Sequence, residues 1–389
     1  MSQPRDTLVG ALGGRAQAQV DTRGRVRTDA DWELDWWIGA DDRWRVPADE
    51  VAVRQHTVGA TPVVETSMRV PGGDAVQRVY GVGGPADVLV IDVENTSGAP
   101  FVIAFVLRAV AGKRLGRVAV HDTQLQIDGR PALLMPSRPA RWAVSSTGDA
   151  LEIVRRGDAR ADAIPALNCR TAGAEVALLL PLPHRTHLRS ALVTAGRDAV
   201  AVDSVDLRSI PSAAQAAAGW ASQLERAMRV ELPDERLQRA IDAARCQVLL
   251  AAEGAARPDP SVVMALEDWG FDTEADAAWR RLGVRARRRA ARRPPPASWP
   301  RPGDDDPAGL LLDVRAALAS DARDDEVTLL TDWPHSWGGA SLDVHDAPTR
   351  AGLVSYAVRW HGMWPVLLWD CERPGVTLRC PGLDPDWAT

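Results

Sequence analysis

Residues 353–371 read LVSYAVRWHGMWPVLLWDC, and this stretch shows most clearly that the chain builds sheets. In its first half, apolar residues at every second position alternate with Ser355, Ala357 and Arg359. Its second half, residues 366–369, is continuously apolar, and a short segment containing Gly362 separates the two. A period of two bounded by Gly and Pro is typical of strands and not of helices. We therefore expect a β-hairpin of strands 353–360 and 366–370.

The N-terminal half repeats this strand pattern many times. Short apolar stretches are separated by turn-forming Gly, Pro, Asn and Asp, as at residues 71–74, 95–98 and 128–131. Many short strands with this punctuation predict an antiparallel sandwich and not alternating strands and helices. The expected strands are 51–58, 62–70, 75–82, 88–94, 101–110, 117–122, 124–127, 132–135, 141–145, 151–155, 175–180 and 200–207.

After Pro211 the pattern changes to helices. Residues 212–228 are rich in alanine, with Ser212 as the expected N-cap, and residues 236–253 repeat apolar side chains every three to four positions. Two further short helices are expected at 262–269 and 273–282, the second capped by Asp272.

The resulting fold class is mainly β with a helical insert. We expect a large N-terminal antiparallel β-sandwich at residues 1–211 and a helical region at 212–320. An Arg/Pro-rich linker at 285–307 lies inside that region, and its basic run and the acidic residues after it suggest a solvated segment. A small C-terminal β-sandwich-like domain at 321–389 completes the chain.

Composition excludes several classes of protein. The chain has 389 residues, 46% hydrophobic and 25% charged, with a net charge of -6, which argues against a general nucleic-acid binder. The four cysteines form no CxxC pair and have no histidine at metal-ligand spacing, so we expect no metal and no cofactor. No signal peptide or membrane span is recognisable, and a cytoplasmic location is expected.

The aromatic residues are unevenly used, with 15 Trp but only 3 Phe and 2 Tyr. Lys113 is the single lysine, so arginine carries nearly all positive charge. The codons of Trp and Arg are GC-rich, and a GC-rich bacterial genome explains both excesses. The alternative is that some tryptophans serve as flat platforms for sugar rings.

The order of these segments resembles a known architecture. Residues 88–108 (VLVIDVENTSGAPFVIAFVLR), the helices 237–253 and 262–282, and residues 356–372 (YAVRWHGMWPVLLWDCE) are similar to parts of glycoside hydrolases with an (α/α)6 toroid. That group includes the glucoamylase-like, glycogen-debranching-like and maltose-phosphorylase-like enzymes. The resemblance implies an N-terminal β-sandwich, a ring of helical hairpins and a C-terminal β-sandwich.

One departure from that group affects the expected function. A closed toroid needs about a dozen helices, and the helical region here has room for only four or five. The loops that carry the catalytic carboxylates in such enzymes are largely missing, so no catalytic residue is transferred to this chain. The adjacent pair Glu267 and Asp268 fits a solvated helix face better than a catalytic pair.

Two short segments are candidates for carbohydrate binding. Asp41, Asp42, Arg43 and Trp44 offer hydroxyl-binding carboxylates, a forked donor and a stacking ring. An Asp–Arg ion pair with Trp44 packed in the core is the simpler explanation of the same residues. His361 and Trp364 lie at the turn of the predicted hairpin, where Trp364 is the best candidate for an exposed ring. Trp360 and Trp369 are expected in the core.

Three functions remain open. The first is a glycoside-hydrolase-like protein that has lost catalysis and acts as a carbohydrate-binding or scaffolding protein. The second is an active glycosidase or phosphorylase on α-glucans that a homo-oligomer completes. The third is a structural interaction module with no affinity for sugars.

Overall fold

The structure is a computed structural model that describes residues 6–84, 87–164, 166–169, 171–193, 205–289, 296, 298–301 and 306–389. The chain divides into two compact units, Met1–Ala217 and Ala218–Thr389. The predicted helical region and the predicted C-terminal domain thus share the second unit, apart from the first residues of one helix. The division into three domains stays a prediction.

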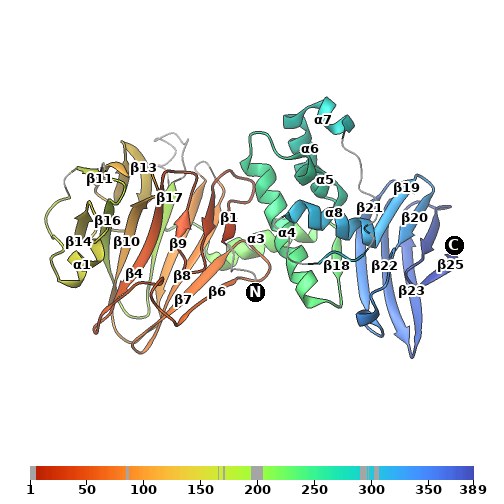
Figure 1. Cartoon of the computed structure of the whole chain (residues 1–389), viewed down its shortest axis with the longest axis horizontal. Helices are drawn as coiled ribbons and strands as arrows, with labels where there is room; N and C mark the ends of the chain where they lie inside the picture. Colours follow the sequence, from red (N-terminus) through yellow and green to blue (C-terminus); the bar gives the residue numbers. More distant parts are fainter. Residues whose placement is uncertain are drawn as a thin grey trace. The chain divides into compact units, whose positions relative to one another are not determined.

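The first unit contains an eight-stranded antiparallel sheet (Figure 1). Its order is β1-β2-β3-β4-β10-β16-β14, with β5 paired to β4. The strands are β1 (Thr7–Gly10), β2 (Gln17–Val20), β3 (Val26–Arg27), β4 (Trp32–Gly39), β5 (Trp44–Arg45), β10 (Phe101–Ala109), β14 (Arg141–Ser145) and β16 (Glu175–Leu182).

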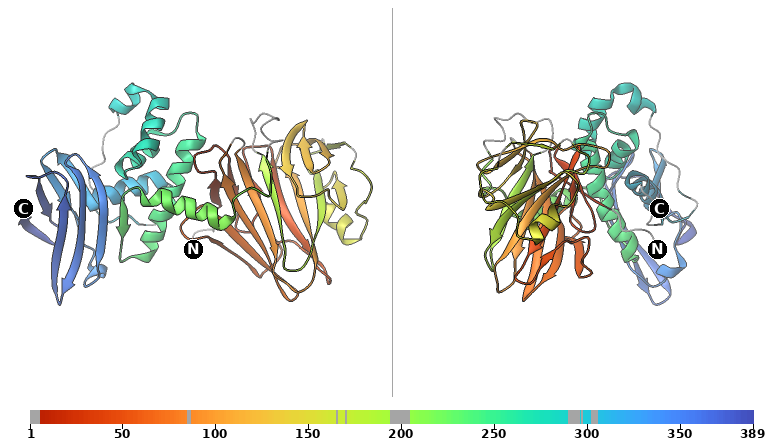
Figure 2. Two further views of the ribbon diagram at one scale, coloured as in Figure 1. Left: turned by 180° about the vertical axis from the view of Figure 1, so that it is seen from behind. Right: turned by 60° about the vertical axis from the view of Figure 1, so that its left-hand side comes forward.

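A nine-stranded sheet faces the first one, as Figure 2 also shows. Its order is β15-β11-β12-β13-β17-β9-β8-β7-β6. The strands are β6 (Val53–Thr57), β7 (Val64–Val70), β8 (Gly73–Val82), β9 (Val88–Asn95), β11 (Gly116–His121), β12 (Gln124–Ile127), β13 (Arg130–Leu134), β15 (Leu167–Cys169) and β17 (His187–Val193). The predicted antiparallel β-sandwich is confirmed.

Alternation along each strand builds the core between the two sheets. On β4, Trp32, Leu34, Trp36 and Ile38 join Met68 and other apolar residues of the opposite sheet in the main core cluster. The intervening residues of β4 lie on the outer face of the eight-stranded sheet. Because that face is also covered, β4 is buried along nearly its whole length.

A short helix covers this outer face and corrects one sequence prediction. Residues 151–155 were expected to be a strand, but Ala150–Arg155 form helix α1. Ala150 and Val154 are four residues apart, which places them on one helix face, and both pack in a second apolar cluster with Trp37 and Leu179. Six residues are too few to distinguish this spacing from alternation in sequence.

The outer face of the nine-stranded sheet holds the segment that leads out of the sandwich. The Tyr80 hydroxyl donates a hydrogen bond to the carbonyl of Pro211 at 2.9 Å, and Arg189 Nη1 donates a hydrogen bond to the carbonyl of Ile210. Ala213 and Ala217 of helix α3 (Ala213–Glu225) pack against the same sheet.

The second unit begins with helices whose ends agree with local capping chemistry. Asp234 caps α4 (Glu235–Gly254) and Asp259 caps α5 (Pro260–Asp268), each accepting from backbone N–H groups. The expected cap Asp272 is instead the first residue of α6 (Asp272–Leu282), and Phe271 occupies the cap position. Two further helices are α7 (Val284–Arg289) and α8 (Pro307–Leu318).

Two four-stranded sheets complete this unit. The orders are β18-β21-β22-β23 and β19-β20-β24-β25. The strands are β18 (Arg229–Glu231), β19 (Ala319–Arg323), β20 (Glu326–Leu329), β21 (Leu342–Thr349), β22 (Gly352–His361), β23 (Trp364–Cys371), β24 (Thr377–Cys380) and β25 (Asp384–Ala388). The predicted hairpin is confirmed as β22 and β23.

The helices pack directly on these sheets. The Tyr356 hydroxyl donates to the carbonyl of Leu318 at 2.7 Å, and Arg315 donates to the carbonyl of Pro348. The fold class of a mainly β chain with a helical insert is therefore confirmed. Most of the Arg/Pro-rich linker after Arg289 and most of the strand expected at 200–207 lie outside the described residues.

Candidate functional site

The loop after β4 carries the four residues predicted to bind a sugar. Asp41, Asp42 and Arg43 are exposed, whereas Trp44 is half-buried. Asp42 accepts two hydrogen bonds from Arg45, at 2.8 and 2.7 Å, and these bonds lower the pKa of Asp42 to about 2. Arg43 binds both carboxylate oxygens of Glu50 and thereby lowers the pKa of that group. Asp42 and Arg43 are thus already held in ion pairs.

Trp44 itself lines a hollow of about 420 Å3 on the outer face of the eight-stranded sheet. We call this space the Trp44 hollow. Its lining consists of Trp44, Val102, Ala140, Arg141, Val154, Gly157, Ala159, Leu179 and Pro181. Asp41, Asp42 and Arg43 are not among the lining residues, so the structure separates the ring from the polar groups expected to act with it. The sugar-binding role of these four residues stays a prediction.

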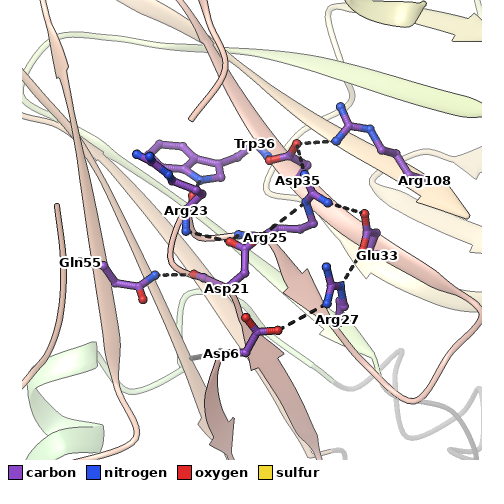
Figure 3. A network of polar contacts seen from close by, with 10 residues as sticks. All are labelled: Asp6, Asp21, Arg23, Arg25, Arg27, Glu33, Asp35, Trp36, Gln55 and Arg108. Atoms are coloured by element: carbon purple, nitrogen blue, oxygen red, sulfur yellow. Dashed lines mark hydrogen bonds and ion pairs between the residues drawn. The ribbon is translucent and has the colours of Figure 1, made fainter. Parts of the chain in front are cut away.

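A network of ion pairs crosses the outer face next to Trp37. Arg108 donates to the buried Asp35 at 2.7 Å and also binds Glu175 on the neighbouring strand. Figure 3 shows Arg25 between Glu33 and Asp35, with Arg108 reaching Asp35 from another strand. Burial lowers the pKa of Arg108, but the two carboxylates beside it outweigh burial and raise it overall.

This network has a structural explanation. Glu175 accepts a hydrogen bond from the backbone N–H of Ala150, at the start of α1, at 3.2 Å. Each of the three carboxylates Glu33, Asp35 and Glu175 is held by a guanidinium group. Burial raises the pKa of Asp35, although Arg108 and Arg25 oppose that shift. Because every carboxylate of the network already has a partner within the protein, we assign the network to positioning β3, β4 and α1.

A second hollow lies on the sandwich near Trp32, and we call it the Trp32 hollow. Its volume is about 530 Å3. The loop before β4, the loop before β11, the turn between β12 and β13, and the end of β17 contribute to it. Its lining residues are Asp29, Ala30, Asp31, Trp32, Arg114, Leu115, Ile127, Asp128, Arg130, Pro131, Ala132 and Val193.

The Trp32 hollow gathers charges of both signs. Asp31 pairs with Lys113 at 3.2 Å, and Asp128 accepts from the backbone N–H of Arg117 at 2.8 Å. Among the described residues, neither the Asp29 carboxylate nor the guanidinium groups of Arg114 and Arg130 have an ion-pair partner. These three exposed side chains are therefore free to bind a ligand.

Local sequence patterns do not single out these residues. Asp31 and Trp32 begin a stretch rich in Trp and carboxylates, and residues 128–131 have only the composition of a turn. The two segments are about a hundred residues apart, and antiparallel pairing within two different sheets brings them together. A single sequence contains no signal for that proximity.

The predicted binding residues of the hairpin lie on a free surface. His361 and Trp364 face each other across the turn, His361 is exposed, and 76% of Trp364 is accessible. Trp360 is half-buried and donates its indole N–H to the carbonyl of Ala340 at 2.8 Å. Trp369 was expected in the core, but 46% of it is accessible because β23 is the last strand of its sheet.

Trp364 belongs to a larger apolar strip, which we call the β23 strip. Its members are Trp364, Val366 and Leu368, which alternate along β23 and so share one face, whereas Trp369 lies on the other face. Exposed apolar side chains gathered on one face usually mark a contact with another macromolecule. The strip is thus broader than one stacking platform for a sugar ring. The sugar-binding role of His361 and Trp364 stays a prediction.

Within the described part of the chain, no group of three or more His, Cys, Asp or Glu side chains could hold a metal ion. Within the same residues, no helix is long and apolar enough to cross a membrane.

Comparisons with known proteins do not assign this chain to a family. No protein-family model matches the sequence, and no curated protein matches it. Among solved structures, a family GH92 alpha-mannosidase from Bacteroides thetaiotaomicron shows 7% sequence identity and a TM-score of 0.27. The match covers 63% of this chain and 38% of that enzyme. At this TM-score the likeness supports no conclusion about the activity of this chain, and the toroid remains unconfirmed.

Proposed function

We propose that this chain is a carbohydrate-binding protein and that a sugar unit occupies the Trp32 hollow. The observation that carries the proposal is the free Asp29 carboxylate beside the free guanidinium groups of Arg114 and Arg130. Sugar hydroxyls both donate and accept hydrogen bonds. A carboxylate accepts from them and a guanidinium donates to them, so the three groups together could hold several hydroxyls.

The size and the charge balance of the hollow support a neutral, polyhydroxylated ligand. Its volume of about 530 Å3 lies within the ordinary range for small-molecule sites. Three carboxylates in the lining face two arginines, and Lys113 neutralises one of the carboxylates. With nearly balanced charge, the hollow has little reason to prefer a strongly charged ligand over a neutral one.

The proposal includes binding without hydrolysis. Between Ala213 and Leu318, the described residues form six helices, about half of what a closed toroid needs. Glycoside cleavage also requires two carboxyl groups placed on either side of the scissile bond. Asp31 and Asp128 already have partners in Lys113 and the backbone of Arg117, which leaves Asp29 as the free acid of the hollow.

A glycan array followed by calorimetry tests this proposal. The array should identify at least one neutral oligosaccharide, and Asp29→Asn and Arg130→Gln should each weaken its binding about tenfold. Asp122→Asn is the matched control, because Asp122 is exposed, lies outside the lining and has a φ of 53° that asparagine tolerates. No binding across the array, or equal losses in the control, would contradict the proposal. Turnover of the bound glycan would overturn the loss of catalysis.

The β23 strip favours a second candidate, a structural interaction module. Its exposed apolar side chains suit a protein partner better than a sugar. Flat calorimetry against all glycans, together with stable self-association that requires the strip, would favour this function over carbohydrate binding.

A further inference from the structure

The Trp44 hollow differs in chemistry from the proposed sugar site. Its walls are the Trp44 ring and aliphatic side chains such as Val102, Val154 and Leu179, and Arg141 is the charged residue of its lining. A sugar would leave most of its hydroxyls facing these apolar walls without partners, which is unfavourable. A ligand for this space should be apolar over most of its surface and polar at one end.

Arg141 is held in place but not neutralised. It begins β14, opposite Leu179 of β16, and its Nη1 donates to the carbonyl of Ala159 at 2.9 Å. A neutral carbonyl orients the guanidinium group without cancelling its charge. No carboxylate among the described residues pairs with Arg141.

Neighbouring arginines do have carboxylate partners. Arg45, next to Trp44, is bound by Asp42, and Arg160, next to Ala159, is bound by Asp162. Asp42 and Asp162 are therefore occupied, and among the described residues the charge of Arg141 beside the apolar hollow has no paired counterpart. A ligand carboxylate would provide that counterpart, and a guanidinium group matches it with two parallel hydrogen bonds.

We propose that the Trp44 hollow binds a small monocarboxylate with an aromatic or aliphatic body. The carboxylate would bind Arg141, and the body would pack on Trp44 and the aliphatic walls. A hollow of about 420 Å3 is large enough for such a molecule. A dianionic phosphate fits less well, because the lining has one guanidinium group and no second cation. This site is independent of the sugar proposal and shares no residue with the Trp32 hollow.

Calorimetry on the full chain with charged and neutral probes of the same shape tests the proposal. The pairs are phenylacetate against 2-phenylethanol, and hexanoate against 1-hexanol. We expect the carboxylate of at least one pair to bind at least tenfold more tightly than its alcohol. Arg141→Gln should weaken binding of the carboxylate probe about tenfold and leave binding of the alcohol probe unchanged, because only the carboxylate uses the guanidinium charge.

Two other variants separate binding in the hollow from general attraction to arginines. Ala159→Leu should abolish binding of both probes by filling the space. Arg138→Gln is the matched control, because Arg138 is exposed and lies outside the lining. This variant should bind both probes as tightly as the wild-type chain does. Equal affinity of acid and alcohol for the wild-type chain, no binding of either probe, or equal losses in Arg141→Gln and Arg138→Gln would each overturn the proposal.

Discussion

The indole ring of Trp44 lies directly over the backbone of Gly39. The two residues are paired between β5 and β4, and a β-carbon at Gly39 would stand 2.7 Å from ring atom Cζ2. Only glycine leaves room for the ring at this position. This contact fixes one wall of the Trp44 hollow, so the hollow depends on a residue that does not line it.

We therefore expect Gly39→Ala to displace Trp44. Overpacking of this kind costs about 1–3 kcal/mol of stability. Displacement of the ring should also weaken the binding of any ligand in the Trp44 hollow. Chemical denaturation measures the first effect and calorimetry the second. Gly98→Ala is the matched control, because a β-carbon there meets nothing within 4 Å. Equal stability of the two variants would show that the ring adapts without cost.

Asp42 should titrate well below an ordinary aspartate, because its hydrogen bonds from Arg45 lower its pKa to about 2. A carboxyl group with a lowered pKa in the folded state stabilises the protein above its ordinary pKa. This contribution is lost as the pH falls from about 4 towards 2. An NMR titration of the Asp42 carboxyl carbon measures the shift. Arg45→Gln should abolish it and Arg43→Gln should not, and a wild-type midpoint near 4 would refute the pairing.

The four cysteines should differ in the rate at which their thiols react. Burial raises the pKa of Cys246 and of Cys380 to about 12 and also raises that of Cys169, whereas Cys371 is half-exposed. Since the thiolate is the reactive form, a disulfide reagent at pH 8 should find one fast thiol in the folded protein and four after unfolding. Cys371→Ser should remove the fast phase and Cys169→Ser should keep it. A second fast thiol would contradict the burial of the other three.

Gly219→Ala should stabilise the protein. Gly219 lies exposed inside α3, and a β-carbon there meets nothing within 4 Å. Alanine in an open helical position contributes about 0.5–1 kcal/mol relative to glycine. Gly270→Ala is the contrasting variant. Gly270 has a φ of 82°, which alanine adopts only with strain, so this substitution should destabilise the protein. Thermal unfolding of both variants measures the two signs, and a lower melting temperature for Gly219→Ala would contradict the structure of α3.

The β23 strip should promote self-association. Replacing Trp364 and Leu368 with serine should lower the weight-average mass measured by light scattering at micromolar concentration, because apolar area is removed from the contact. Val51→Ser is the control, because Val51 is 97% accessible but lies in the first unit and is not part of the β23 strip. A wild-type chain that is monomeric throughout would show that the strip does not join copies of this protein.

Sequence patterns predict strands and helices well where they repeat. Alternation identified β22, a continuous apolar run identified β23, and apolar spacing identified α4. Both signals come from residues close together in the chain, where local geometry decides which side chains share a face. The pattern fails where an element is too short to repeat, as in α1, whose six residues fit a strand and a helix equally.

The candidate sites could be predicted much less well. The composition of residues 41–44 draws attention to Trp44, yet it does not show that Asp42 and Arg43 bind Arg45 and Glu50. Asp29 and Arg130 have no distinctive neighbours in sequence. Their common hollow exists because different strands and loops end at the same place.

The sequence by itself thus determined the mainly β fold with its helical insert, because strand and helix periodicity are properties of neighbouring residues. The tertiary structure alone decided which charges meet and which remain free. It left Arg141 beside Trp44 without a carboxylate partner among the described residues, and it gathered Asp29, Arg114 and Arg130 around one hollow. These outcomes depend on the pairing of strands that are far apart in the chain, and periodicity contains no information about that pairing.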